Sequence, residues 1–126
     1  MSPRVVVVGL GPAGTDLLTE GVRREIERIP VRYVRTARHP AVAELTPGVA
    51  IEALDRHYEA AARLEDVYEA VVAELVEAAI RHGEVLYAVP GSPDVAERSV
   101  ELLRADDRVD VEVLPALSFV DLAWGR

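Results

Sequence analysis

Four short runs of apolar, largely β-branched residues divide this chain at intervals that helices can fill. They cover residues 4–10, 31–36, 85–89 and 109–114. Apolar residues are nearly continuous within each run, which is typical of parallel strands that are buried on both faces. Strands that alternate with helical segments favour right-handed crossovers. The sequence therefore predicts an α/β fold, with a mostly parallel sheet and helices on both faces.

The segments between these runs carry apolar residues at three- and four-residue steps, the period of an amphipathic helix. The expected helices cover residues 15–28, 55–82 and 94–104, and a fourth begins in 118–124. Thr15 or Asp16 can cap the first helix, and Pro30 stops it. The second would be about 40 Å long, twice a typical strand, so we expect a break near residues 60–64. Gly83 closes it with a left-handed cap.

Composition excludes several classes of chemistry. The 126 residues are about one domain, and the absence of cysteine excludes disulfides and thiolate ligands. All 14 basic residues are arginine, so lysine-dependent chemistry is excluded as well. A formal charge of −8 disfavours nucleic acid as a partner. The sequence shows neither a leader-like segment nor a long apolar run, so we expect a cytoplasmic protein with no membrane partner. We also expect no metal site.

A ligand site is expected where the four strands end. Ligands of open parallel sheets bind beyond the carboxyl ends of the strands. The segments at those ends are rich in glycine and proline: GLGPAG (9–14), RTARHP (35–40), PGSP (90–93) and PALS (115–118). The two proline loops at 90–93 and 115–118 suit a neutral group such as an adenosine or amino acid moiety, because proline offers no N–H donor. Turn chemistry without a ligand is the alternative for each loop.

The first loop has the glycine spacing of a dinucleotide-binding turn. That spacing is formed by Gly9, Gly11 and Gly14. Two residues argue against a dinucleotide, because Pro12 removes a donor from the phosphate cradle and Asp16 places a carboxylate at the helix start. The second strand ends without the acid that would hold a ribose, although Arg35 and Arg38 could receive the 2′-phosphate of NADP. An NADP-binding oxidoreductase domain therefore stays an alternative.

Four motifs, in this order and spacing, resemble the N-terminal half of the tetrapyrrole (corrin/porphyrin) methylase family. They are GLGPAGTDLLT, RTARHP, YAVPGSP and LPALSFVD, and together they extend over most of the chain. The likeness is closest to the branch fused to MazG-type nucleoside triphosphate pyrophosphohydrolases. The resemblance implies a methyltransferase that uses S-adenosyl-L-methionine (SAM), with the cofactor between two α/β subdomains. Residues 1–126 would then be the N-terminal subdomain, inactive without its second half.

The resemblance also implies which residues hold the cofactor and which hold the substrate. The cofactor-binding residues would be Pro12, Pro90, Gly91, Ser92, Ser118 and Phe119. The substrate, a tetrapyrrole-like or another small molecule, would contact Gly11, Arg35, Arg38 and His39. A solvent-facing loop position is the alternative for His39. Two residues depart from the family pattern, because Ser92 stands where many members have aspartate and Ala116 replaces a common glycine.

The implied reaction needs no acid–base pair. Methyl transfer from a sulfonium is an in-line displacement whose leaving group departs uncharged, so the protein mainly aligns the reactants and excludes water. We therefore assign no catalytic residue. The resemblance leaves open a homodimer and a fused or associated pyrophosphohydrolase. A non-catalytic dimerisation or regulatory domain of such a pyrophosphohydrolase is the alternative to a methyltransferase.

Overall fold

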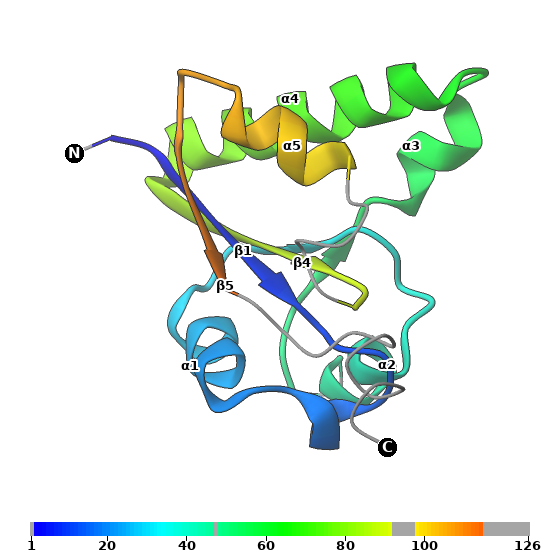
Figure 1. Cartoon of the computed structure of the whole chain (residues 1–126), viewed down its shortest axis with the longest axis vertical. Coiled ribbons are helices and arrows are strands. Elements are labelled where there is room, and N and C mark those ends of the chain that lie inside the picture. Colours follow the sequence, from blue (N-terminus) through cyan, green and yellow to red (C-terminus); the bar gives the residue numbers. More distant parts are fainter. Residues whose placement is uncertain (1, 47, 92–97, 115–126) are drawn as a thin grey trace.

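A computed structural model of the chain describes residues 2–46, 48–91 and 98–114. Its centre is a parallel sheet of five strands in the order β3-β2-β4-β1-β5 (Figure 1). The strands are β1 (Arg4–Gly9), β2 (Arg32–Val34), β3 (Glu52–Ala53), β4 (Glu84–Val89) and β5 (Asp110–Leu114). The predicted parallel α/β fold is confirmed.

Helices cover both faces of this sheet, as the sequence predicted. One face is covered by α3 (Asp55–Ala60), α4 (Leu64–His82) and α5 (Arg98–Arg104), and the other by α1 (Glu20–Arg28) and α2 (Pro40–Leu45) (Figure 1). Alternate residues of β1 point to opposite faces of the sheet. Val5 and Val7 pack in the first core, under α3, α4 and α5, whereas Val6 and Val8 pack in the second core, under α1 and α2. All four valines are fully buried. Each contributes at most about 1.5–3 kcal/mol of transfer free energy.

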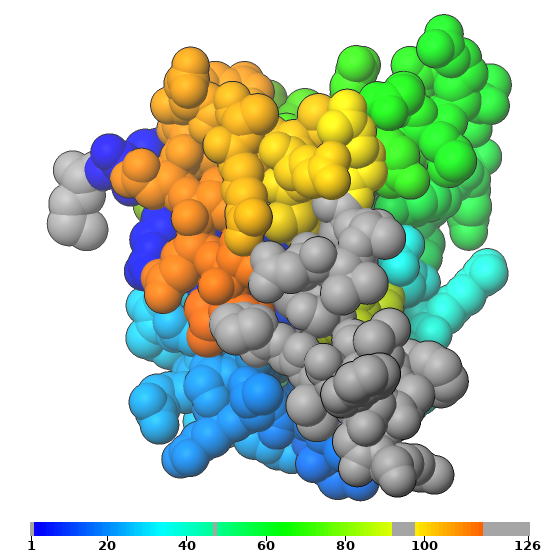
Figure 2. Space-filling model, in the orientation of Figure 1, coloured from blue at the N-terminus to red at the C-terminus, as the bar shows by residue number. Residues whose placement is uncertain are grey.

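β5, one of the two edge strands of the sheet, is less buried than the sequence predicted. In β5, Asp110 and Glu112 are exposed, and the residues between and after them are half-buried. Figure 2 shows β5 (orange) on the molecular surface, between α5 above it and α1 below it. Continuous burial therefore holds for β1 and β4, which are central, and is wrong for β5 because it has a strand neighbour on one side only within the described residues.

The first helix begins later than predicted. Thr15–Leu17 form a separate 3-10 turn, and the side chain of Thr19 caps α1 by accepting a hydrogen bond from the N–H of Val22 at 3.2 Å. Thr15, a predicted cap, instead donates from its N–H and its hydroxyl to the carboxylate of Glu44. The chain then extends at Leu18 before α1 starts.

Two short elements were not predicted, whereas the break in the long helix was. α2 has six residues and β3 has two, which is too short for either to show a periodic pattern. The expected 55–82 helix is divided into α3 and α4, and α4 ends at Gly83 with φ of +88°. Of the expected helix at 94–104, the structure describes α5; the expected helix at 118–124 lies outside the described residues.

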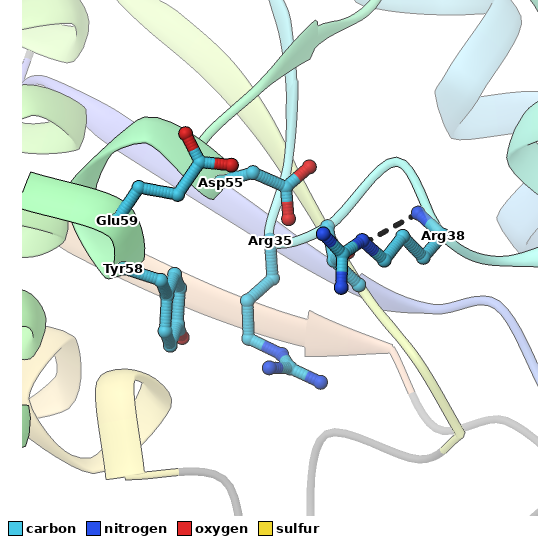
Figure 3. A pocket seen from close by; sticks show the side chains of 6 residues that line it. Arg35, Arg38, Asp55, Tyr58 and Glu59 are labelled. Atoms are coloured by element: carbon cyan, nitrogen blue, oxygen red, sulfur yellow. Dashed lines mark hydrogen bonds between the residues drawn. The ribbon is translucent and has the colours of Figure 1, made fainter.

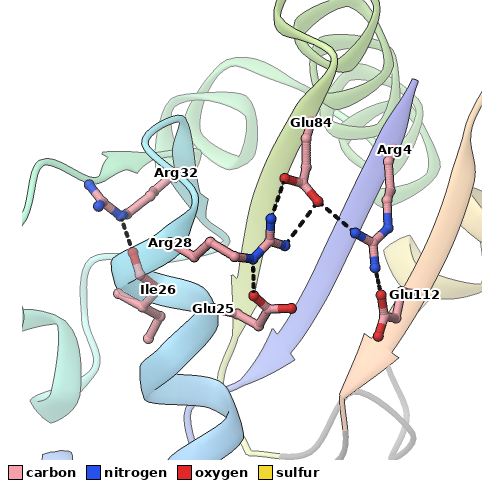
Figure 4. Close-up of polar contacts among 7 residues, drawn as sticks. All are labelled: Arg4, Glu25, Ile26, Arg28, Arg32, Glu84 and Glu112. Carbon is pink, nitrogen blue, oxygen red and sulfur yellow. Dashed lines mark hydrogen bonds and ion pairs between the residues drawn. The ribbon is translucent and has the colours of Figure 1, made fainter. Parts of the chain in front are cut away.

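An ion-pair cluster ties the amino-terminal edge of the sheet together (Figure 4). Glu84, at the start of β4, accepts hydrogen bonds from Arg28 at 2.8 and 3.0 Å and from Arg4 at 2.7 Å. Arg28 also pairs with Glu25 at 2.5 Å, and Arg4 with Glu112. The hydrogen bonds from Arg28, opposed by burial, hold the pKa of Glu84 below its ordinary value of 4.5. This cluster lies at the opposite end of the strands from the expected ligand site.

Candidate functional site

The loops that follow β1 and β4 are joined directly. Gly11 and Gly91 form an antiparallel bridge in which each N–H donates to the carbonyl oxygen of the other at 3.0 Å. Both have positive φ, 73° and 65°, a conformation that L side chains adopt only with strain. Pro12 follows Gly11 and Pro90 precedes Gly91, and both prolines are half-buried. Gly11, a predicted substrate contact, and Gly91, a predicted cofactor contact, are thus hydrogen-bonded neighbours.

This bridge lies where adjacent strands send their chains to opposite faces of the sheet. β1 and β4 are neighbours, but β1 is followed by α1 on one face, whereas β4 is followed by α5 on the other. Such a reversal is the place where ligands bind in open α/β sheets. The topology therefore makes the Gly11–Gly91 bridge and the loops beside it the candidate ligand site.

His39 connects the loop after β2 to the same bridge. Its side chain is only 7% exposed, so the solvent-facing alternative is wrong. Nδ1 accepts a hydrogen bond from the N–H of Ala41 at 3.0 Å, which caps α2, with Pro40 in the first turn. Nε2 lies 2.7 Å from the carbonyl oxygen of Gly11. Both ring nitrogens already have hydrogen-bond partners within the chain. A contact between His39 and a substrate stays a prediction.

The segment 35–38 is held by contacts to β4 and to the first residue of α3. The N–H of Arg35 donates to the carbonyl of Ala88 at 2.9 Å, and the N–H of Ala37 donates to Oδ2 of Asp55 at 2.9 Å. Burial raises the pKa of Asp55. Hydrogen bonds from Ala37 and Thr36, together with the charges of Arg38 and Arg35, lower it by more, so the net pKa lies below its ordinary value of 3.8. Asp55 is therefore a carboxylate that fixes the arginine loop.

A cavity of about 420 Å³ opens beside this loop (Figure 3). It is lined by Arg35, Thr36, Arg38, Asp55, Tyr58 and Glu59. Figure 3 shows Arg35 extending past the ring of Tyr58, and the Cζ atom of Arg35 lies 6.0 Å from the ring centroid, at the outer limit of a cation–π contact. With two arginines and two carboxylates, the cavity presents charge of both signs.

The glycine loop does not have the geometry of a phosphate cradle. The N–H and carbonyl of Gly11 are both used in the bridge to Gly91. The carboxylate of Glu44 lies at the start of the 3-10 turn, where it accepts the N–H of Thr15 at 2.8 Å, and a Cβ at Gly14 would collide with it. Hydrogen bonds from the Thr15 hydroxyl and N–H lower the pKa of Glu44, so it is charged at neutral pH. An anionic side chain in that place repels a pyrophosphate.

The structure brings most of the predicted site residues to one edge of the sheet. Those that it describes there are Gly11, Pro12, Arg35, Arg38, His39, Pro90 and Gly91. Ser92, Ser118 and Phe119 lie outside the described residues. Sequence reasoning missed Asp55, Tyr58 and Glu59, because they follow the two-residue strand β3, which has no recognisable pattern. Among the described residues, no cluster of three or more His, Asp or Glu side chains could hold a metal ion.

Comparison with known proteins assigns the fold to a family. Residues 4–126 match the family described as Tetrapyrrole (Corrin/Porphyrin) Methylases. The chain belongs to the tetrapyrrole methylase family. It is also 40% identical over 128 residues to the uncharacterized protein YabN of Bacillus subtilis (strain 168), in a match that covers 98% of this chain and 26% of YabN.

Solved structures of methyltransferases share this architecture. Uroporphyrin-III-C-methyltransferase from Thermus thermophilus superposes with a TM-score of 0.73 at 24% identity, over 99% of this chain and 53% of that one. The same enzyme complexed with S-adenosylhomocysteine gives 0.65 at 28% identity, over 97% and 48%. The precorrin-6Y methylase of Archaeoglobus fulgidus gives 0.68 at 23% identity, over 100% and 58%. This tetrapyrrole methylase chain therefore spans about half of these structures and about a quarter of YabN.

No helix among the described parts of this family member is long and apolar enough to cross a membrane. The longest, α4, has 19 residues but carries charged side chains along its exposed face. Its buried residues instead face β1 and β4 in the first core. The helix is therefore amphipathic and packs against the sheet.

Proposed function

We propose that this chain is the N-terminal half of a SAM-dependent methyltransferase and that the edge formed by β1, β2 and β4 is part of its methyl-transfer site. The hydrogen-bonded bridge between Gly11 and Gly91 is the observation that carries the proposal. It joins the loop of Gly11 and Pro12, to which the family resemblance assigns one substrate contact and one cofactor contact, to the loop of Pro90 and Gly91, which the resemblance assigns to the cofactor. Reactants held by the two loops would be neighbours, which is what an in-line displacement requires.

The backbone at Gly91 fits the approach of a cofactor. A Cβ built on this residue meets nothing within 4 Å, so the main chain is open to a ligand on that side. We assign Pro12, Pro90, Gly91, Ser92, Ser118 and Phe119 to the cofactor. When bound, SAM supplies an electrophilic methyl group, and the chain's own residues align that group with the acceptor and keep water out. The leaving group takes up no proton, so the reaction does not require a paired acid and base.

The acceptor would lie on the arginine side of the site. Arg35 and Arg38 offer guanidinium groups to an acidic small molecule, and the cavity beside them is about 420 Å³. Asp55 and Glu59 at the same cavity would reject a ligand that carries negative charge throughout. An acceptor with separate acidic and neutral or cationic groups, tetrapyrrole-like or otherwise, suits this pattern best.

Calorimetry with S-adenosylhomocysteine tests the proposal. The ligand is titrated into residues 1–126 and into a longer chain that continues into a second α/β half. We expect binding by the longer chain, and binding at least tenfold weaker by residues 1–126, because the solved relatives are about twice as long. Failure of the longer chain to bind at millimolar ligand would refute the proposal.

A regulatory role is the second candidate. It is favoured by the match to only 26% of YabN, since a chain of that length has room for further domains. In this hypothesis the domain dimerises and controls a fused or associated MazG-type pyrophosphohydrolase. Sedimentation of the longer chain tests it: a monomer whose pyrophosphohydrolase activity is unchanged by loss of residues 1–126 would contradict it.

A further inference from the structure

We infer that His39 is a positioning residue that holds the Gly91 turn in place through the carbonyl of Gly11. The geometric part of this inference stands on contacts alone, and its consequence for ligand binding rests on the proposed function. His39 comes from the loop after β2, Gly11 from the loop after β1, and Gly91 from the loop after β4. His39 thereby links the loop after β2 to the loop after β1 directly, and to the loop after β4 through the carbonyl of Gly11.

The hydrogen-bond partners determine which ring nitrogen carries the hydrogen. The N–H of Ala41 can only donate, so Nδ1 of His39 must present its lone pair. The carbonyl oxygen of Gly11 can only accept, so Nε2 must carry the hydrogen and donate it over 2.7 Å. The ring is thus held in one tautomer and one orientation by two backbone groups on opposite sides.

The Gly11 carbonyl receives two donors. Besides Nε2 of His39, it accepts the N–H of Gly91 at 3.0 Å, and the N–H of Gly11 donates back to the Gly91 carbonyl at 3.0 Å. Both glycines have positive φ, so their conformation is not the one that an extended chain would keep by itself. The histidine therefore adds a third hydrogen bond to a bridge that continues the pairing of β1 with β4, where the N–H of Leu10 donates to the carbonyl of Val89 at 2.8 Å.

The position of His39 also excludes a role at the protein surface. His39 is 7% exposed, and among the described residues other than tyrosines it and Ser99 are the buried polar ones. Arg38, the residue before it, lines the cavity, whereas Ala41 and Val42 after it belong to the second core. His39 therefore sits at the junction between the acceptor side of the site and the packed interior.

Two conservative substitutions separate the two hydrogen bonds. The amide of asparagine coincides with Nδ1 of histidine, so His39→Asn keeps a helix cap but cannot reach Gly11. The amide of glutamine extends to the place of Nε2, so His39→Gln can donate to Gly11 but loses the cap. If His39 positions the Gly91 turn, the two variants must differ at Gly91; if it only caps α2, they must differ at α2.

Amide hydrogen exchange reports this difference without any ligand. We expect the N–H of Gly91 to exchange about tenfold faster in His39→Asn than in wild type, and less than about threefold faster in His39→Gln. The amides of Leu75 and Val76, buried in α4, serve as the control for global unfolding. Equal acceleration in both variants, or a larger one in His39→Gln, would overturn the inference.

A wild-type measurement covers the case in which a variant does not fold. Nitrogen chemical shifts of the imidazole ring should show Nδ1 without hydrogen and Nε2 with it. The opposite tautomer would overturn the inference, since Nε2 could not then donate to Gly11.

Ligand binding supplies the functional arm. S-adenosylhomocysteine should bind the longer chain about five- to tenfold more weakly in His39→Asn than in His39→Gln. Absence of binding in wild type would refute the proposed function, while the exchange pattern at Gly91 would still decide whether His39 holds the turn. Equal affinities of the two variants, in a chain that binds, would overturn the role of His39 in the site.

Discussion

A methyl group added at Gly91 should impair cofactor binding more than it impairs folding. The residue has φ of +65°, and a Cβ there would meet nothing within 4 Å. The cost to the folded chain is therefore conformational rather than steric, about 1–2 kcal/mol for an alanine at positive φ. The methyl group would project into the open space that we assign to the cofactor.

Gly83 provides the matched control. It has φ of +88°, a Cβ there also meets nothing within 4 Å, and it precedes β4 at the end of the sheet remote from the site. Gly91→Ala should lose about 1–2 kcal/mol in urea denaturation, and Gly83→Ala at least as much, because its ψ of −41° lies outside the left-handed α region. Only Gly91→Ala should also weaken the binding of S-adenosylhomocysteine, by about tenfold or more, equivalent to about 1.4 kcal/mol.

The two measurements are made on the same longer chain, by denaturation and by calorimetry. The assignment of Gly91 to the cofactor would be refuted if Gly91→Ala lost stability but still bound S-adenosylhomocysteine with wild-type affinity. Equal losses of affinity in both variants would also refute it, because the effect would then follow stability rather than the site.

Three further predictions concern carboxylates. Glu84→Gln should cost about 1–2 kcal/mol in denaturation at pH 7, because it removes the anion that Arg28 and Arg4 share. Since the folded pKa of Glu84 is lowered, its stabilisation is complete above its ordinary value of 4.5 and is lost as pH falls through the folded pKa; a difference from wild type that does not shrink below pH 4.5 would contradict this. Glu44→Gln should loosen the 3-10 turn without creating NADPH affinity, checked by thermal shift with NADPH. Asp55→Ala should speed amide exchange at Ala37, whereas Asp55→Asn, which keeps an acceptor oxygen, should do so much less.

The fold could be predicted because the chain's patterns are local. Continuous burial in β1 and β4 and the helical period of α4 are visible along the sequence, since each element buries its own apolar residues. The break before Leu64 and the glycine cap at Gly83 were also predictable. α2 and β3 were not, because six and two residues are too few to show a period.

The candidate site was predicted in its location but not in its contacts. Strand ends and glycine–proline loops indicated which edge of the sheet to examine, because parallel strands bring all their carboxyl ends together. The partners of Thr15 and His39 could not be foreseen, since Glu44 lies 29 residues from Thr15 and Gly11 lies 28 residues from His39. Asp55 and Glu59, the two carboxylates of the cavity, were missed because the two-residue strand β3 before them shows no pattern.

By itself, the sequence determined the α/β class and the parallel sheet, because alternating strands and helices leave few topologies open. Only the tertiary structure showed which contacts the loops at the carboxyl ends of the strands make with one another. It showed that Glu44 stands where a phosphate would bind, that Gly11 is joined to Gly91, and that His39 is buried between them. Hydrogen bonds between distant loops depend on how the sheet brings the loops together, and no spacing within one loop encodes them.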